Sequence, residues 1–260
     1  MIIDKNKKFI FIHNPRTGGT AISKSLLNTD NVKELIDHDT YIRLFNINVR
    51  PRKQYYQADG GSSFERLVSG LSTNTKFDAL ETVYSDVPNL FFSHPDHLSL
   101  YSCTSQRLLK EFKYKFVCVR DPWSRMLSYY SKIKTYHELD GGTHTSALGR
   151  PFTFDFFIDE ITRNRFDNNL NYLYEVPQTY WTYGVDEVIR YDELNKKWED
   201  ILQSCGLSYQ PLLEASKETN ISQRKKCSDY YENGNQLIEK VAHCFAEEIA
   251  LFNFDYNGDL

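Results

Sequence analysis

The chain has 260 residues, of which 40% are hydrophobic and 25% charged, proportions that are ordinary for a globular protein with a sizeable core. Its formal net charge of −4 excludes a global basic field for nucleic acid, so any anion site must be built locally. No stretch approaches the apolar length that crosses a bilayer. A first strand is expected to begin by about Lys8, so no signal peptide is expected. The five cysteines are odd in number and lack CxxC spacing, which suggests neither a disulfide framework nor a zinc site and fits a reducing, cytoplasmic setting.

Short, continuous apolar runs predict buried strands at residues 9–12, 90–92, 116–119 and 188–189. Continuous rather than alternating apolarity is typical of strands covered on both faces, as in a parallel sheet. Helical patterns lie between the runs, and strands that alternate with helices predict an α/β layer fold. We expect one domain spanning residues 1–260.

Two of the helices have distinctive sequence signals. Asp121 is placed to cap a helix whose first-turn residue is Pro122. A last helix is predicted from one apolar stripe, with Glu247 and Glu248 off it. The stripe consists of Ile238, Val241, Ala242, Phe245, Ile249 and Phe252.

Two polar segments, 37–85 and 135–150, are rich in Gly, Asn, Ser and Thr. We interpret them as insertions or lids over a site rather than as plain surface loops. They are therefore expected to shape that site.

A glycine-rich turn, HNPRTGGT, follows the first predicted strand and leads into a helix over residues 21–27. In such a turn the backbone N–H groups and the helix N-terminus can point at one anion. The turn lacks the lysine of the G-x-x-x-x-G-K-[ST] loop, and G-x-G-x-x-G is absent, so an ordinary ATPase or dehydrogenase is disfavoured. Taken alone, the turn is equally compatible with glycines that merely adopt positive φ angles.

A second segment, YKFVCVRDPWSRMLSYY, places Arg120 at the end of another buried strand and Ser128 within the following helix. An arginine beside a helix start can bind a phosphate with its forked guanidinium group, and Ser128 can add a hydroxyl. Taken alone, RDPWSR is more simply a helix start with a surface ion pair. The two segments together favour a phosphate-binding site.

These two segments resemble the PAPS-dependent sulfotransferases, in particular the carbohydrate sulfotransferase branch of the family 2 type. That family carries a PKTGGT-like loop and an RDPxxRxxSxY-like segment, which stand here as PRTGGT and RDPWSRMLSYY. The likeness continues through VPQTYW, VDEVIRYDEL and NISQRKKCSDYY and leaves the segments 37–85 and 135–150 unmatched. These two insertions are therefore expected to shape the acceptor site. It implies a three-layer, P-loop-NTPase-like fold with a central parallel sheet flanked by helices.

The resemblance also implies a donor, a product and their binding residues. The donor is 3′-phosphoadenosine 5′-phosphosulfate (PAPS), the product is PAP, and no metal is required. Arg120 and Ser128 correspond to residues that bind the 3′-phosphate, which Arg224, with Lys225 or Lys226, closes over. The loop residues that correspond to the 5′-phosphosulfate site are Arg16, Thr17, Gly18, Gly19 and Thr20.

The chain departs from the family pattern at two places. Arg16 stands where the family usually has lysine, and a planar fork is not equivalent to a mobile point charge. Asn168, Asn169 and Asn171 appear where relatives often have a histidine before the PQ dipeptide. Nearby, Gln178 and Trp181 are candidates for lining the acceptor cleft, which is expected to take a small-molecule or glycan hydroxyl. Tyr191 is a further candidate for a position near the nucleotide.

The implied reaction is an in-line sulfuryl transfer through a loose transition state, in which positioning and charge stabilisation do most of the catalysis. Arg16 and the loop N–H groups are aimed at the charge that grows on the leaving 5′-phosphate. The acceptor hydroxyl needs a base, for which His94 in NLFFSHPDHLSLY is the first choice and His97 the second. Glu81 stays open as the base, and His13 is interpreted as structural or as a donor to the nucleotide.

Two other functions stay open. A P-loop-type kinase would use the same general fold, although the missing G-K-[ST] and the absence of a Mg²⁺-ligand pattern argue against it. A non-catalytic nucleotide- or glycan-binding module would be a decayed enzyme in which Arg16 marks lost chemistry. Neither nucleic acid nor integral membrane association is expected.

Overall fold

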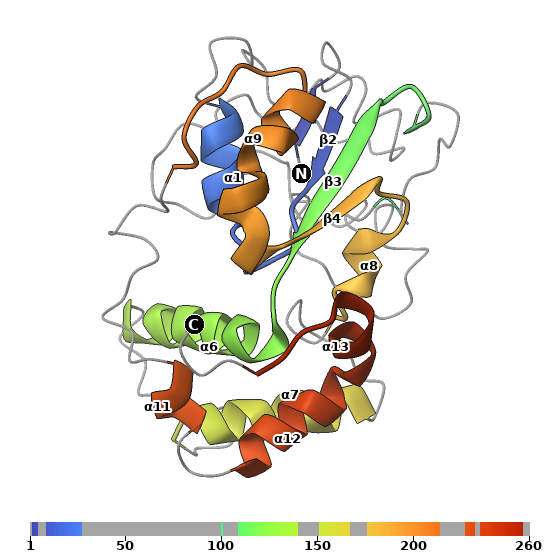
Figure 1. Cartoon of the computed structure of the whole chain (residues 1–260). Helices are drawn as coiled ribbons and strands as arrows, with labels where there is room; N and C mark the ends of the chain where they lie inside the picture. The colour runs from blue at the N-terminus through green and yellow to red at the C-terminus, as the bar shows by residue number, and fades with distance from the viewer. Residues whose placement is uncertain are drawn as a thin grey trace, which may run out of the picture. The chain divides into compact units, whose positions relative to one another are not determined.

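The computed structural model describes residues 2–4, 9–27, 100, 109–139, 151–166, 176–213, 227–231 and 235–256 (Figure 1). The chain divides into two compact units, Met1–Val119 with Gln178–Ala215 and Arg120–Pro177 with Ser216–Leu260. A single domain over residues 1–260 stays a prediction.

A mostly parallel sheet forms the centre of the first unit. The described strands are β1 (Ile2–Asp4), β2 (Phe9–Ile12), β3 (Tyr114–Val119) and β4 (Glu187–Arg190), and they are hydrogen-bonded in that order. β2, β3 and β4 are parallel, with Phe11 opposite Phe116 and Val117 opposite Val188. The predicted strands at 9–12, 116–119 and 188–189 and the mixed α/β class are confirmed, whereas 90–92 lies outside the described residues.

Strand β1 corrects two of the expectations. The sheet begins at Ile2 rather than near Lys8, and β1 runs antiparallel to β2, with Ile3 opposite Ile10. Only residues 5–8 connect the two strands, whereas a parallel crossover needs a dozen or more residues. The sheet is therefore mostly rather than wholly parallel.

Helices α1 (Gly19–Leu27) and α9 (Leu194–Ser204) cover one face of this sheet (Figure 1). The other face is also removed from solvent, because Ile10, Ile12, Val117 and Val119 are fully buried. Coverage on both faces accounts for the continuous apolar runs that predicted these strands. The core on the α1 and α9 side includes Phe9, Phe11, Phe116, Cys118, Ile189, Ile22, Leu26, Leu194, Trp198, Ile201 and Leu202.

The second unit is helical in its described part. Its helices are α6 (Pro122–Leu139), α7 (Phe154–Phe166), α11 (Cys227–Tyr231), α12 (Asn235–Cys244) and α13 (Ala246–Phe252). An aromatic cluster packs α6 against α7, in which the Tyr130 ring contacts Phe152, Phe154 and Phe157 at centroid distances of 5.3 to 6.0 Å.

The start of α6 lies where the sequence predicted it, whereas its end does not. The Ser124 N–H donates to Asp121 Oδ1 at 2.8 Å, so Asp121 caps the helix that begins at Pro122, as predicted. The helix continues to Leu139, so the polar segment expected from residue 135 begins as helix, because no glycine interrupts it before Gly141. Residues 140–150 and the other expected insertion, 37–85, lie outside the described residues.

The predicted last helix is interrupted. Phe245, with φ −117° and ψ 25°, separates α12 from α13. Glu248, which was expected off the apolar stripe, is nevertheless buried. It stands seven residues after Val241, about two helical turns, so it lies close to the face that carries the stripe.

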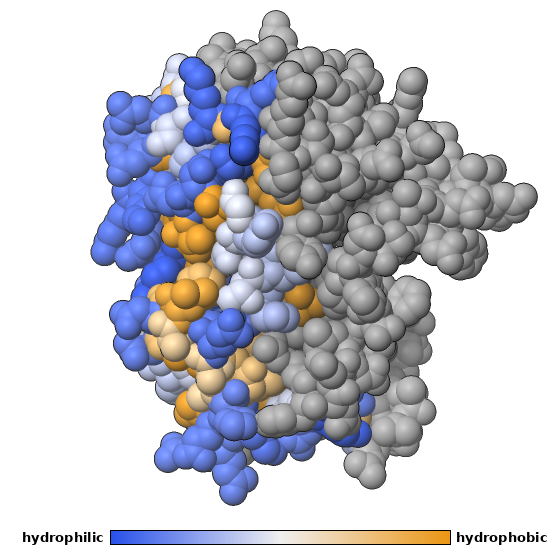
Figure 2. Space-filling model, turned by 90° about the vertical axis from the view of Figure 1, so that its right-hand side faces the viewer, coloured by the Kyte–Doolittle hydropathy of each residue, from blue (hydrophilic) through white to orange (hydrophobic). Residues whose placement is uncertain are grey.

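The surface of the described residues is mixed. Figure 2 shows a face on which hydrophilic residues and smaller groups of hydrophobic ones occur together. The large apolar side chains exposed in the described part are Tyr183, Tyr191, Tyr209 and Leu251. Within this part, no helix is both long and apolar enough to span a membrane.

Candidate functional site

The loop between β2 and α1 has an unusual backbone. Arg16 and Gly18 have φ angles of 66° and 86°, both in the left-handed region that non-glycine residues rarely adopt. Turns that combine right- and left-handed residues direct successive N–H groups into a concavity that binds anions. The loop therefore has the backbone geometry of an anion site.

The N-terminus of α1 contributes to the same site. The first intrahelical bond runs from the Ile22 N–H to the Gly18 carbonyl at 3.1 Å, so the N–H groups of Gly19, Thr20 and Ala21 have no acceptor within the helix. The first turn carries no acidic side chain that would compete for these donors. The positive end of the helix dipole is thus left for a bound anion.

The predicted loop residues differ in exposure. Thr20 is exposed, Arg16 and Gly18 are half-buried, and Thr17 and Gly19 are buried. The Thr17 hydroxyl donates to the Asn14 carbonyl at 2.8 Å, so this side chain closes the loop. What Thr17 can offer an anion is its backbone N–H.

Two aromatic side chains lie against the loop glycines. A methyl group added to Gly18 would come within 2.7 Å of the Tyr191 ring, and one added to Gly19 would overlap the imidazole of His13. His13 also stacks on Phe11 at a centroid distance of 6.1 Å. The structure therefore brings His13 and Tyr191, both left open by the sequence, next to the predicted anion loop.

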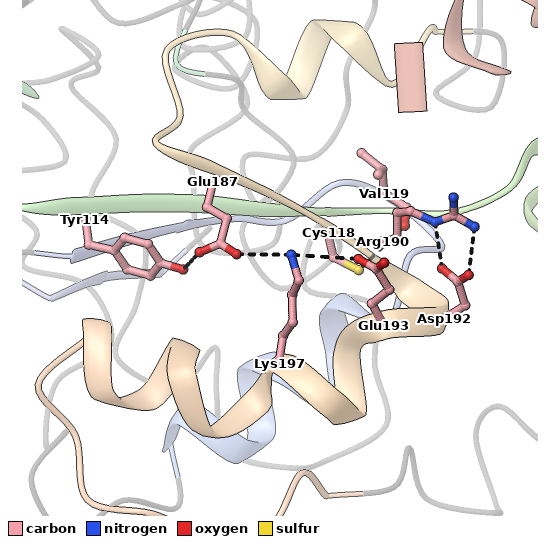
Figure 3. A network of polar contacts seen from close by, with 8 residues as sticks. All are labelled: Tyr114, Cys118, Val119, Glu187, Arg190, Asp192, Glu193 and Lys197. Atoms are coloured by element: carbon pink, nitrogen blue, oxygen red, sulfur yellow. Dashed lines mark hydrogen bonds and ion pairs between the residues drawn. The ribbon is translucent and has the colours of Figure 1, made fainter. Parts of the chain in front are cut away.

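Tyr191 belongs to a short 3₁₀ helix, η4 (Tyr191–Glu193), whose flanks are held by a polar network (Figure 3). Arg190 donates from Nη2 and Nε to Asp192 at 2.7 and 3.0 Å. The Lys197 ammonium lies 3.5 Å from Glu187 and 3.7 Å from Glu193. Figure 3 shows that these contacts link β4, η4 and α9. The segment that carries Tyr191 is therefore held between β4 and α9.

The same network shifts two pKa values. The hydrogen bond from Arg190 lowers the pKa of Asp192 below its usual value, against a smaller opposing effect of burial. Tyr114 donates its phenol proton to Glu187 at 2.8 Å, and burial together with this carboxylate raises the pKa of Tyr114. Tyr114 is therefore a fixed donor at neutral pH.

Two buried side-chain amides, those of Asn14 and Gln178, form a pair next to the loop, which the sequence did not predict. Asn14 Nδ2 donates to the Cys118 carbonyl at 3.0 Å and to Gln178 Oε1 at 3.1 Å. Both amide side chains are completely buried, as is Trp181. Burial contradicts the expectation that Gln178 and Trp181 line an acceptor cleft, because neither side chain reaches the surface. No local signal predicts a pairing over 164 positions.

In the second unit, Arg120 follows β3 and is half-buried, while Ser128 on α6 is 3% exposed. The helix start expected for RDPWSR is confirmed, and Asp121 and Arg125 of this segment are buried rather than at the surface. Arg125, which the sequence analysis did not single out, points its two terminal nitrogens at the Val176 carbonyl at 3.4 and 3.5 Å and lies 4.0 Å from Glu248. The buried Arg125 therefore has a structural role in this segment.

Several predicted residues lie outside the described residues, namely His94, His97, Glu81, Arg224, Lys225, Lys226, Asn168, Asn169 and Asn171. In the described part of the chain, Cys118, Cys205, Cys227 and Cys244 are free thiols. No group of three His, Cys, Asp or Glu side chains among the described residues is arranged to hold a metal ion.

A model of the Sulfotransferase family matches residues 1–255. The chain belongs to the sulfotransferase family. A solved sulfotransferase structure from Alicyclobacillus acidocaldarius is similar at 13% sequence identity and a TM-score of 0.38, with 96% of each chain covered. No curated protein matches the sequence. The family match bears out the resemblance seen in PRTGGT and RDPWSRMLSYY, and membership supports a transferase that carries out sulfotransfer.

Proposed function

We propose that this sulfotransferase-family protein transfers a sulfuryl group from PAPS to a hydroxyl of a carbohydrate or glycoconjugate and releases PAP. The observation that carries the proposal is the loop from Arg16 to Thr20. Its left-handed residues and its helix N-terminus without acidic side chains suit a phosphosulfate. The reaction as proposed needs no metal.

The bond between sulfur and the 5′-phosphate oxygen breaks while the acceptor oxygen forms a bond to sulfur. Negative charge grows on the leaving 5′-phosphate, and the Arg16 guanidinium and the N–H groups from Thr17 to Thr20 stabilise it. The acceptor proton passes to a base, for which we propose His94. Arg16 in place of lysine offers two parallel donors to the leaving phosphate.

The nucleotide is anchored separately from the reacting group. We assign the 3′-phosphate to Arg120, Ser128 and Arg224. Tyr191 supports a nucleotide at the loop, because its ring lies against Gly18 and is 41% exposed. An exposed ring beside an anion site suits a base or a ribose.

The first test is calorimetric titration of the full chain with PAP, ADP and 5′-AMP. We expect PAP to bind at least tenfold more tightly than ADP, because a charge-assisted contact to the 3′-phosphate contributes about 1.5–3 kcal/mol. Arg120→Ala should abolish this preference and leave ADP binding largely unchanged. Equal binding of the three nucleotides would overturn the assignment of PAPS as donor.

The second test is transfer of label from PAPS to a panel of sugars. Arg16→Ala should lower the transfer rate about 100-fold, as the loss of one preorganised donor does in other enzymes. Full activity of this variant would contradict the assigned role. Tight PAP binding without transfer to any acceptor would favour the non-catalytic module, and tight binding of ATP·Mg²⁺ with no 3′-phosphate preference would favour the kinase.

A further inference from the structure

We propose that Asn14 and Gln178 are positioning residues that hold the backbone of Arg16 in the conformation that sulfuryl transfer requires. The inference rests on the proposed function. Neither side chain is exposed, so neither touches the donor or the acceptor; they act through the loop.

Asn14 is the point at which three elements meet. Its Nδ2 group donates to the Cys118 carbonyl in β3 and to Gln178 Oε1, the residue before α8 (Thr179–Thr182), at 3.0 and 3.1 Å. Its own N–H donates to the Ile12 carbonyl at 3.1 Å. The residue that opens the loop is thereby fixed to β2, to β3 and to the start of α8.

Asn14 also closes the short segment that contains Arg16. The Asn14 carbonyl accepts the Thr17 hydroxyl at 2.8 Å, and Pro15 and Arg16 lie between these two groups. Arg16 has a φ of 66°, a conformation that a non-glycine residue keeps only where its surroundings over-determine it. The Asn14 side chain supplies that constraint. Without its hydrogen bonds, the Asn14 carbonyl and the Thr17 hydroxyl that donates to it can both move.

Gln178 completes the constraint. Its oxygen is one of the two acceptors of Asn14 Nδ2, so it fixes the rotation of the Asn14 amide. Loss of this acceptor leaves one of the two N–H groups of the buried Asn14 amide without a partner and frees the amide to turn. A displacement of the reacting groups by about 1 Å lowers a rate about 100-fold.

The chain offers a matched control at the opposite end of α1. Gln210 Nε2 donates to the Ser25 carbonyl, so this amide also ties α1 in place, yet it lies away from the loop. Gln178→Met and Gln210→Met each remove one such amide and keep the side-chain length. Both variants are expected to lower stability, which urea unfolding measures.

Only Gln178→Met should change catalysis. We expect its kcat to fall 10- to 100-fold while the Kd for PAP changes less than fivefold, because the 3′-phosphate contacts persist. Gln210→Met should keep the wild-type kcat. An equal fall in both variants, or none in Gln178→Met, would overturn the inference and identify the amide pair as merely stabilising.

The effect of Gln178→Met in a protein that lacks the Arg16 side chain is a further measurement. A purely structural role of Gln178 would leave this effect as large as in the wild-type protein. In an Arg16→Ala background, Gln178→Met should lower kcat less than threefold, since the group that it positions is already gone. Full additivity of the two effects would contradict the proposal.

A final arm separates this inference from the proposed function. If wild-type protein shows no preference for PAP over ADP, the proposed function fails, and amide hydrogen exchange over residues 13–22 still decides the positioning role. Faster exchange in Gln178→Met than in Gln210→Met supports it. Identical exchange in the two variants overturns it.

Discussion

The guanidinium group of Arg125 and the carboxylate of Glu248 lie 4.0 Å apart, with both side chains removed from solvent. Arg125 comes from the first turn of α6 and Glu248 from α13. The Tyr129 ring lies 5.5 Å from the Arg125 guanidinium carbon. Burying two charged groups this deeply carries a large desolvation cost, which their mutual attraction partly offsets.

Breaking this pair should therefore destabilise the protein strongly. We expect Glu248→Ala to lower the free energy of unfolding by about 3–5 kcal/mol, because it removes a charged partner of a buried guanidinium. Replacing both residues, by Arg125→Met with Glu248→Leu, should cost much less. Urea unfolding with an unchanged m-value measures both effects.

An exposed ion pair in the same unit is the control. Lys240 contacts Asp159 at 2.5 Å, with side chains 42% and 51% exposed. Asp159→Ala should change stability by less than about 1 kcal/mol. A similar loss for Asp159→Ala and Glu248→Ala would show that burial does not decide the strength of the Arg125–Glu248 pair.

Gly19 and His13 should be coupled. Gly19→Ala forces the imidazole of His13 away from the helix start, and we expect a loss of about 1–3 kcal/mol in unfolding free energy. In a His13→Ala background the same change should be neutral or stabilising, because alanine is the better helix former. Thermal unfolding of the four proteins in this cycle gives the coupling energy, and additive effects would contradict the contact.

Asp192 should titrate below its ordinary range in the wild-type protein. Its pKa is lowered chiefly by the Arg190 hydrogen bond, so the carboxylate form stabilises the fold above the unfolded-state pKa. That contribution is lost as pH falls through the lower folded-state pKa. NMR titration of the carboxyl carbon should show the pKa rise in Arg190→Ala, and an unchanged value would contradict the pair in Figure 3.

Cys227 should be unreactive at neutral pH. Burial and then the charge of Asp121 raise the pKa of its thiol to about 11. The protonated thiol is the form that the fold favours, so its contribution to stability is complete below the unfolded-state pKa of 9.0 and is lost as pH rises towards 11. Iodoacetamide labelling with peptide mapping at pH 8 should modify the less buried Cys244 well before Cys227. Equal rates would contradict the burial of this thiol.

Local patterns were sufficient for the elements that carry the loop and the α6 segment. The apolar run at residues 9–12 predicted β2, and Asp121 with Pro122 predicted the start of α6, because strand burial and helix capping depend on neighbouring residues. The order of PRTGGT and RDPWSRMLSYY also indicated the family that residues 1–255 match. The three-residue β1 lay below the length at which such patterns are informative.

The sequence by itself therefore determined the main strand-to-helix junctions and the family. Only the tertiary structure decided that Gln178 faces Asn14 rather than an acceptor, that Glu248 turns inward to Arg125, and that His13 lies against Gly19. The Asn14–Gln178 and Arg125–Glu248 contacts join residues far apart in the chain. Burial, rather than any local propensity, requires each of these polar groups to find a partner.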